Sequence, residues 1–279
     1  GFGKMGDALA RQRLATRVRP FLLRRTKGQV AQDLPPRIEE DVICELEGVQ
    51  RDLYRAEYKK ARALLLGAAT TEKFNDLKFH FLSSLTRLRQ ICCHPALVDA
   101  AQRAQPAAKV EALVDLLEPL IEEGHKVLVF SQFASMLELL QQEVRERNWT
   151  EFFLTGQTEN RGPLVESFNA HDGAALFLIS LKAGGFGLNL TSASYVVLFD
   201  PWWNPAVEAQ AIDRTHRIGQ TQTVIAYRLI VKGSIEEKIR ELQKAKSMMA
   251  GDTLGEDRFN QALTLDDFRF LFDSAEAAL

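Results

Sequence analysis

Short apolar runs alternate with amphipathic stretches from about residue 126 onward. The apolar runs cover residues 127–130, 151–154, 175–181, 195–199 and 223–231. Helical periodicity fills much of the rest, most clearly over residues 133–147 and 234–248. Apolar strands that alternate with helices are typical of a parallel sheet whose faces are covered by helices. We therefore expect an α/β fold in this part of the chain.

The first third of the chain has a different pattern. Residues 50–66 and 74–93 show helical periodicity, and residues 37–46 partly alternate as a strand does. Residues 99–108, DAAQRAQPAA, have little apolar periodicity and are expected to form a linker or loop. Near the C-terminus, LTLDDFRFLF is expected to dock as a short helix.

Composition and charge exclude few classes of protein. With 279 residues, 46% of them hydrophobic, the chain can bury a core, and its net charge of −2 creates no global attraction to nucleic acid. Locally, residues 8–32 contain seven basic residues and no acidic one, as expected of a solvated or bracing helix or of a nucleic-acid contact. No apolar run approaches the length of a membrane span.

The three cysteines indicate a structural role. Cys92 and Cys93 are neighbours, which suits neither a disulfide framework nor, with His94 beside them, the usual spacing of zinc ligands. Cys44 is the third. This usage fits a reducing compartment and predicts no metal site in the chain.

Polar and small residues follow the predicted strands, where ligands bind in open α/β sheets. Ser131 and Gln132 follow one strand, and Thr155 and Gly156 follow the next. Such groups either cap a helix or contact a phosphate, and the pattern leaves both possibilities open.

The segment SLKAGGFGLNL follows another predicted strand. Lys182, Gly184, Gly185 and Gly187 lie together in it, and glycines let a backbone approach an anion closely. A dinucleotide-binding motif would need a third glycine at the right spacing, which is absent. A tight packing turn is the structural alternative.

The segment DPWWNP, residues 200–205, places two tryptophans in one loop. Both cannot point inward, so we expect one to cap the core and the other to contact nucleic acid or a partner surface.

The segment QAIDRTHRIGQ carries the most pointed pattern. Gln210, Asp213, Arg214 and Arg217 have the spacing of one helical face, with Val207, Ala211 and Ile212 left to pack. Arginine has a fixed charge and a rigid donor fork suited to phosphate oxygens. A surface ion-pair network is the alternative, and His216 is expected to pack or to form a hydrogen bond.

Together these segments resemble the C-terminal RecA-like lobe of a SWI/SNF-type helicase-superfamily ATPase. The resemblance spans roughly residues 20–245. It rests on FLLRRTKGQVAQDLPPR, LRQICCHP, KVLVFSQF, LISLKAGGFGLNLTSASYVVLFDPWWNPAVEAQAIDRTHRIGQ and RLIVKGSIEEKI, in the family's order. The resemblance implies a RecA-like lobe over residues 99–249. Residues 1–98 would hold a lobe-linking segment and a helical insertion, and residues 250–279 a tail docked on the lobe.

In such motors, ATP hydrolysis drives movement along double-stranded DNA. The resemblance implies that Arg214 and Arg217 reach the ATP phosphates, that Asp213 and Gln210 orient them, and that Asp200 lies at the lobe interface. Gly187 and Asn189 would lie near the nucleotide. The residues expected to contact DNA are Ser131, Gln132, Thr155, Gly156, Lys182, Gly184 and Trp203.

Two motifs of a complete ATPase do not occur in the sequence. There is no G-x-x-x-x-G-K-[ST] phosphate cradle, and no acidic box for magnesium follows an apolar strand. Both belong to the family's N-terminal lobe. We therefore expect a cofactor of ATP with Mg²⁺, magnesium ligands in that partner lobe, double-stranded DNA as the other partner, and little activity from this chain alone. The expected location is the cytoplasm or nucleoid of a bacterium or the nucleus of a eukaryote. The alternative is a standalone DNA- or protein-binding α/β module; the sequence does not identify protein partners.

Overall fold

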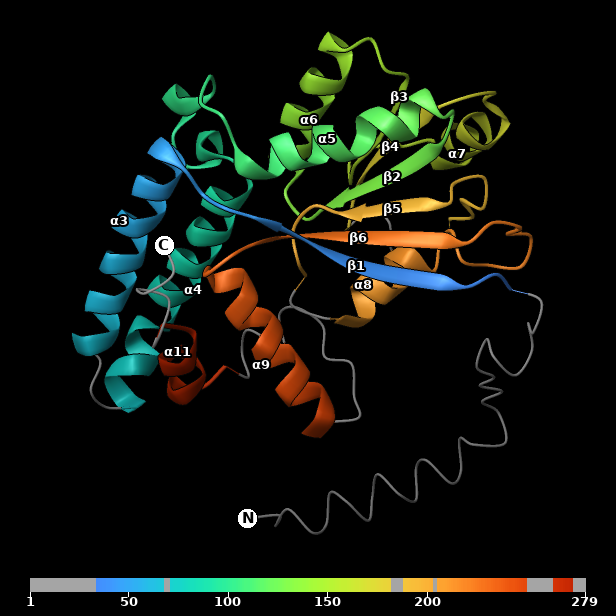
Figure 1. Ribbon diagram of the computed structural model, residues 1–279. Coiled ribbons are helices and arrows are strands. Elements are labelled where there is room, and N and C mark those ends of the chain that lie inside the picture. Colours follow the sequence, from blue (N-terminus) through green and yellow to red (C-terminus); the bar gives the residue numbers. More distant parts are fainter. Residues whose placement is uncertain (1–33, 68–70, 182–187, 203–204, 250–262, 273–279) are drawn as a thin grey trace, which may run out of the picture. The chain divides into compact units, whose positions relative to one another are not determined.

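Six strands of the described residues form one fully parallel sheet (Figure 1). The computed structural model describes residues 34–67, 71–181, 188–202, 205–249 and 263–272. The sheet order is β1-β6-β5-β2-β4-β3. The strands are β1 (Arg37–Cys44), β2 (Lys126–Ser131), β3 (Glu151–Leu154), β4 (Ala175–Ser180), β5 (Tyr195–Leu198) and β6 (Val224–Val231). The predicted α/β class is confirmed.

β1 lies at the edge of this sheet, beside β6. The five strands expected after residue 126 occur within one residue of their predicted bounds. The strand expected over residues 37–46 pairs with β6 along its full length, from Arg37 opposite Val224 to Cys44 opposite Val231. A segment distant in sequence therefore completes the sheet.

Helices cover both faces, because alternate residues of each strand point to opposite sides. Val127 and Val129 belong to one core cluster, and Leu128 and Phe130 to the other. The first cluster includes side chains of α5 (Ala108–Glu122), α6 (Ala134–Glu146) and α9 (Ile235–Met249). The second includes side chains of α7 (Arg161–Ala170) and α8 (Pro205–Ile212).

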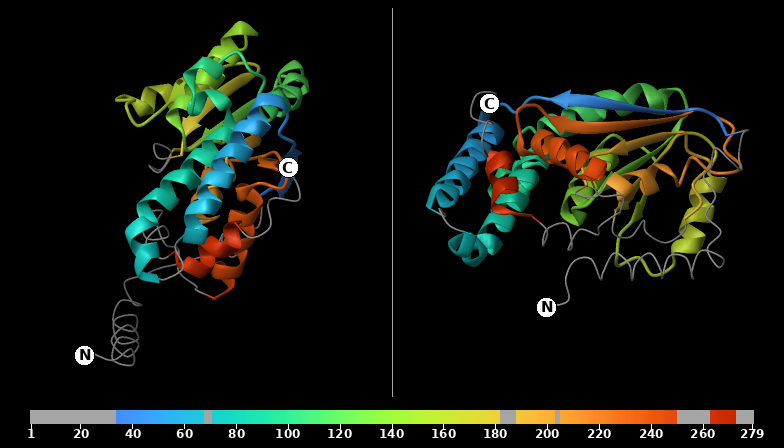
Figure 2. Two further views of the ribbon diagram at one scale, coloured as in Figure 1. Left: turned by 90° about the vertical axis from the view of Figure 1, so that its left-hand side faces the viewer. Right: turned by 90° about the horizontal axis from the view of Figure 1, so that it is seen from below.

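A helical hairpin, α3 (Gly48–Gly67) and α4 (Thr71–Cys93), lies beyond the carboxyl ends of the strands (Figures 1 and 2). After it, the short 3-10 helices η2 (Pro95–Leu97) and η3 (Ala100–Gln102) lead to α5, so the expected loop at 99–108 contains one helical turn. Cys44, Cys92 and Cys93 are buried free thiols.

The tail segment forms a short docked helix, α11 (Leu265–Phe272), as expected, and it packs on this hairpin and on α9. Phe268 is fully buried, with ring centroids 5.3 Å from Phe74 and 5.4 Å from Phe81. None of the helices with described residues is long and apolar enough to span a membrane.

Candidate functional site

The predicted site residues lie at opposite edges of the sheet. Ser131 ends β2 and Thr155 follows β3, so both lie at the carboxyl edge. Arg214 lies at the amino edge, because its carbonyl accepts a hydrogen bond from Leu190 N at 3.1 Å, a few residues before β5 begins. Among the described residues, the sheet therefore separates those expected to contact DNA from the arginines expected to contact the ATP phosphates.

At the carboxyl edge, Asp200 holds the loop that follows β2. Its side chain is fully buried, and its carboxylate accepts hydrogen bonds from Ser131 Oγ at 2.5 Å and from the backbone N–H of Gln132 at 3.2 Å. Ser131 Oγ also accepts a hydrogen bond from Phe133 N at 3.1 Å, just before α6. Asp200 was expected at the interface with the partner lobe. Its carboxylate forms these hydrogen bonds within its own lobe, and the interface role stays a prediction.

The side chain of Gln132 has a hydrogen-bond donor at this edge that is unpaired among the described residues. Its side-chain Nε2 is buried, and no hydrogen-bond partner for it occurs among the described residues. Buried polar groups are normally paired, so this donor is available to an acceptor outside the described residues, such as a water or a ligand oxygen.

The turn after β3 closes on itself. Thr155 N donates to Thr158 Oγ1 at 3.0 Å, and Gln157 N donates to Thr155 Oγ1 at 3.4 Å. A Cβ at Gly156 would meet nothing within 4 Å, so open space surrounds this backbone. These hydroxyls hold the turn and do not cap α7, whose N-cap residue is Asn160, and a phosphate contact by Thr155 and Gly156 stays a prediction.

Part of the expected site lies outside the described residues, namely Lys182, Gly184, Gly187 and Trp203. Trp202 is the inward-pointing tryptophan, 5% exposed and packed in the same core as α8. Asn189 is exposed, and its carbonyl accepts a hydrogen bond from Asn169 Nδ2 at 2.9 Å.

The arginine segment is not one helical face, so that prediction is wrong. α8 ends at Ile212, and residues 213–217 form turns. The Thr215 hydroxyl donates to the Ile212 carbonyl at 2.8 Å, and Arg214 N bonds to the carbonyl three residues back. A side-chain donor that competes for a backbone carbonyl favours such a turn over a continuing helix. Gln210 is exposed on α8, whereas Arg214 is buried. Ala211 and Ile212 pack in the core, as predicted.

Arg214 is the least satisfied cation of this segment. Its side chain is 6% exposed, and no hydrogen-bond partner for its Nε occurs among the described residues. Burial lowers the pKa of Arg214, and so does the nearby charge of Arg217, while Asp213 acts in the opposite direction. The Asp213 carboxylate also accepts a hydrogen bond from Arg37 Nη1 at 3.3 Å. Arg214 and Arg217 therefore lie close together, and Arg214 is buried.

The arginine turn is fastened to the strands by a residue that the sequence patterns did not single out. Gln220 Nε2 donates to the Ala193 carbonyl at 2.8 Å, and its Oε1 accepts from the N–H of Thr221 and of Gln222, each at 2.9 Å. His216 Nε2 lies 2.8 Å from the Pro35 carbonyl, which confirms its expected hydrogen bond. The φ of +103° at Gly219 suits a residue without a Cβ.

The sequence patterns also did not predict two buried ion pairs, because the partners of each pair are far apart in sequence. Lys109 of α5 and Glu236 of α9 are both fully buried, 2.7 Å apart. Glu208 of α8 pairs with Arg228 of β6 at 3.1 Å, and burial raises the pKa of Glu208 although Arg228 opposes it. No cluster of three or more His, Cys, Asp and Glu side chains in the described part of the chain could hold a metal ion.

Comparison with known proteins identifies the family. The model of the helicase conserved C-terminal domain matches residues 108–219, and that of the SNF2-related domain matches residues 4–97. The C-terminal domain of the Sulfolobus solfataricus SWI2/SNF2 ATPase is 30% identical, with a TM-score of 0.68, over 84% of this chain and 97% of that domain. The chain belongs to the SWI2/SNF2 family.

Further relatives are similar over most of this chain. An uncharacterized ATP-dependent helicase of Mycoplasma pneumoniae is 36% identical over 93% of the chain. Human SWI/SNF-related matrix-associated actin-dependent regulator of chromatin subfamily A member 1 is 37% identical over 87%. The chain spans about a quarter of the length of each, 25% and 24%. The S. solfataricus SWI2/SNF2 ATPase core in complex with dsDNA is 31% identical, with a TM-score of 0.69, over 95% of this chain and 57% of that core.

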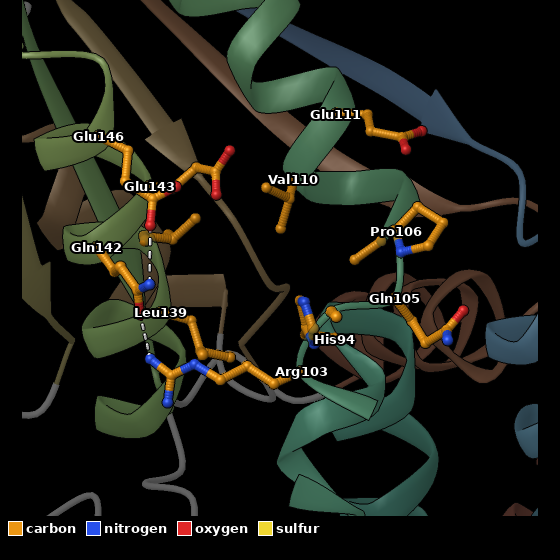
Figure 3. Close-up of a pocket in the computed structure, with 13 residues that line it drawn as sticks. His94, Arg103, Gln105, Pro106, Val110, Glu111, Leu139, Gln142, Glu143 and Glu146 are labelled. Atoms are coloured by element: carbon orange, nitrogen blue, oxygen red, sulfur yellow. Dashed lines mark hydrogen bonds between the residues drawn. The ribbon is translucent and has the colours of Figure 1, made fainter. Parts of the chain in front are cut away.

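This SWI2/SNF2 lobe also has a cavity of about 410 Å³ (Figure 3). It lies between α5, α6 and residues 94–107, and none of the predicted site residues lines it. Arg103 points toward α6 and donates a hydrogen bond to Gln142, whose Nε2 donates to Glu146 at 2.8 Å. Burial and then Arg103 lower the pKa of His94 at its rim.

Proposed function

We propose that this chain is the second, arginine-bearing lobe of an ATP-dependent translocase on double-stranded DNA. Arg214 carries this proposal, because it is a buried cation whose Nε has no hydrogen-bond partner among the described residues. A buried charge is costly unless an opposite charge pairs with it. Arg217 adds a second positive charge nearby, so the group that best completes the site is a multiply charged anion.

The triphosphate of ATP fits these residues. ATP with Mg²⁺ supplies the phosphoanhydride bond whose hydrolysis drives such motors. Arg214 and Arg217 donate hydrogen bonds to phosphate oxygens and neutralise the charge that develops there, which is worth about 10³–10⁵ in rate for comparable arginines. Asp213 and Gln210 orient the two guanidinium groups, and contacts with the nucleotide are proposed for Asn189 and for Gly187, which lies outside the described residues. The phosphate cradle and the magnesium ligands belong to the partner N-terminal lobe, so this chain alone has little activity.

The carboxyl edge binds the DNA backbone. The unpaired Nε2 of Gln132, the open backbone at Gly156 and the hydroxyl of Thr155 favour contacts with phosphate oxygens. We propose the same kind of contact for Ser131 and for Lys182, Gly184 and Trp203, which lie outside the described residues. Phosphate contacts carry no base information, which suits a motor that runs over any sequence. The dsDNA complex of the S. solfataricus relative supports double-stranded DNA as the partner.

The first test compares ATP turnover by this chain with turnover by the full-length protein of its gene, each with and without duplex DNA. We expect turnover only in the full-length protein, with stimulation by DNA. Turnover by this chain alone, or a full-length protein that DNA does not stimulate, would contradict the proposal. Salt-sensitive duplex binding without any effect of nucleotide would instead favour a standalone binding module.

Arginine variants test the assignment of residues. In the full-length protein, Arg214→Ala or Arg217→Ala should lower the turnover number by about 10³–10⁵. Arg145→Ala is a matched control, because Arg145 is an exposed arginine of α6 that pairs only with Glu151 in the described structure. Normal turnover by either variant of the arginine turn would refute its role.

A further inference from the structure

Glu208 ties the first half of α8 to the sheet near its carboxyl edge. It lies in the first half of α8 and is only 7% exposed. One carboxylate oxygen accepts a hydrogen bond from the backbone N–H of Trp202 at 2.8 Å, and the other accepts from Arg228 Nε at 3.1 Å. Both oxygens are therefore engaged, one by a loop and one by a strand.

On the strand side, Arg228 is a fixed anchor. Its other two nitrogens donate to Asp41 and to Glu39, each at 3.0 Å, so that two carboxylates of the neighbouring strand β1 hold the guanidinium. Arginine's planar fork loses little freedom when several carboxylates hold it. Glu208 thus ties α8 to a rigid part of the sheet.

On the loop side, a short series of contacts connects Glu208 to the carboxyl edge, where DNA is proposed to bind. Trp202 is two residues beyond Asp200, whose carboxylate holds Ser131 and the N–H of Gln132. A second buried cation, Arg89 of α4, donates to the Pro201 carbonyl at 2.5 Å. A shift of this loop when the phosphate backbone binds would therefore act on the Glu208 carboxylate.

At the other end of α8 is the arginine turn. An α-helix of eight residues is about 12 Å long and moves as one piece. Ile212 ends the helix and Arg214 follows two residues later, held by the bond from Leu190 N to its carbonyl. A displacement at the Glu208 end is thus transmitted to the guanidinium groups at the opposite edge.

We infer that Glu208 is a positioning residue that couples DNA binding at the carboxyl edge to the placement of Arg214 and Arg217. It acts through the Trp202 N–H and the Arg228 guanidinium, and it contacts neither ATP nor DNA. This inference rests on the proposed function, since it needs a DNA-stimulated ATPase.

The test uses the full-length protein and measures ATP turnover with and without a duplex DNA of fixed length, together with the Kd for that duplex. Glu208→Gln keeps the shape and one oxygen, but it removes the negative charge that holds Arg228. We expect the stimulation by DNA to fall about tenfold, within the range typical of coupling between sites, while the Kd for DNA stays within about twofold.

Asp41→Asn is the matched control, because Asp41 also pairs with Arg228, and its other printed partner is Arg240 of α9 rather than α8, the loop at Trp202 or the arginine turn. It should keep the stimulation of the unaltered protein. Equal losses in both variants, in parallel with equal drops in Tm, would mean that the ion network is only structural and would overturn the inference. Full stimulation in Glu208→Gln would overturn it directly.

If Glu208→Gln does not fold, Glu208→Asp takes its place. It keeps the charge but is one methylene too short to reach Trp202 and Arg228 together, so stimulation should still fall, and unchanged stimulation would overturn the inference. Failure of the proposed function looks different, because the unaltered protein would then show no stimulation by DNA at all.

Discussion

Removing the ammonium of Lys109 should destabilise the fold strongly. Lys109 is fully buried and donates to Glu236 Oε1 at 2.7 Å and to the Phe199 carbonyl at 3.0 Å. In Lys109→Met the Glu236 carboxylate keeps only the N–H of Val231, at 3.0 Å, among its described partners. An unpaired buried charge costs about 3–5 kcal/mol. That is a large share of the roughly 5–15 kcal/mol by which a typical protein is stable.

The same substitution predicts a dependence on pH. Burial lowers the pKa of Lys109, but Glu236 opposes this, and the net pKa lies above its ordinary value. Burial raises the pKa of Glu236, and Lys109 is the main group that lowers it. Without Lys109 the folded-state pKa of Glu236 therefore rises further above the unfolded value of about 4.3. A raised folded pKa gives stability below the unfolded pKa that is lost as pH rises. The variant should thus lose stability relative to the unaltered chain as the pH rises above about 4.3.

Urea unfolding of this chain, followed by far-UV circular dichroism at several pH values, measures both effects. Lys109→Met with Glu236→Leu should be more stable than Lys109→Met alone, because no buried charge is left unpaired. Lys126→Met is a control: Lys126 bonds the carbonyls of Phe168 and Asn169, so its loss should cost about 1–2 kcal/mol. A midpoint for Lys109→Met that is unchanged, or a double variant no more stable than the single one, would refute the reasoning.

Three further predictions concern other parts of the molecule. Arg214→Ala should not lower the free energy of unfolding, because it removes a buried charge whose Nε has no partner among the described residues; a lower urea midpoint would contradict this. Phe268→Ala should cost about 3–5 kcal/mol by emptying the buried contact of α11, whereas the partly exposed Phe270→Ala should cost under about 1 kcal/mol; equal melting temperatures would show that α11 is not docked. Asp200→Asn should cost about 1–3 kcal/mol, since one of two donors loses its acceptor; an unchanged unfolding midpoint would argue against that role.

Local pattern predicted the strands and helices well, because burial on a sheet or a helix leaves a period in the sequence. The strand at residues 151–154 was located to the residue, and the two hairpin helices were predicted within a few residues of their bounds. Recurrent motifs also indicated the family. The sequence pattern did not predict where α8 ends, because the helical spacing of Gln210, Asp213, Arg214 and Arg217 continues beyond Ile212. In the structure the Thr215 hydroxyl donates to the Ile212 carbonyl, which favours a turn there.

What the sequence determined by itself is therefore the α/β class, the elements and the chemical types of the site residues. Tertiary structure decided which of them meet. Lys109 and Glu236 are 127 residues apart, and Asp41 and Arg228 are 187 apart, so no local period connects them. The sheet order decided that Asp200 supports Ser131 at one edge while Arg214 lies at the other. The physical reason is that charges and hydrogen bonds pair by distance in space, and only the folded chain fixes that distance.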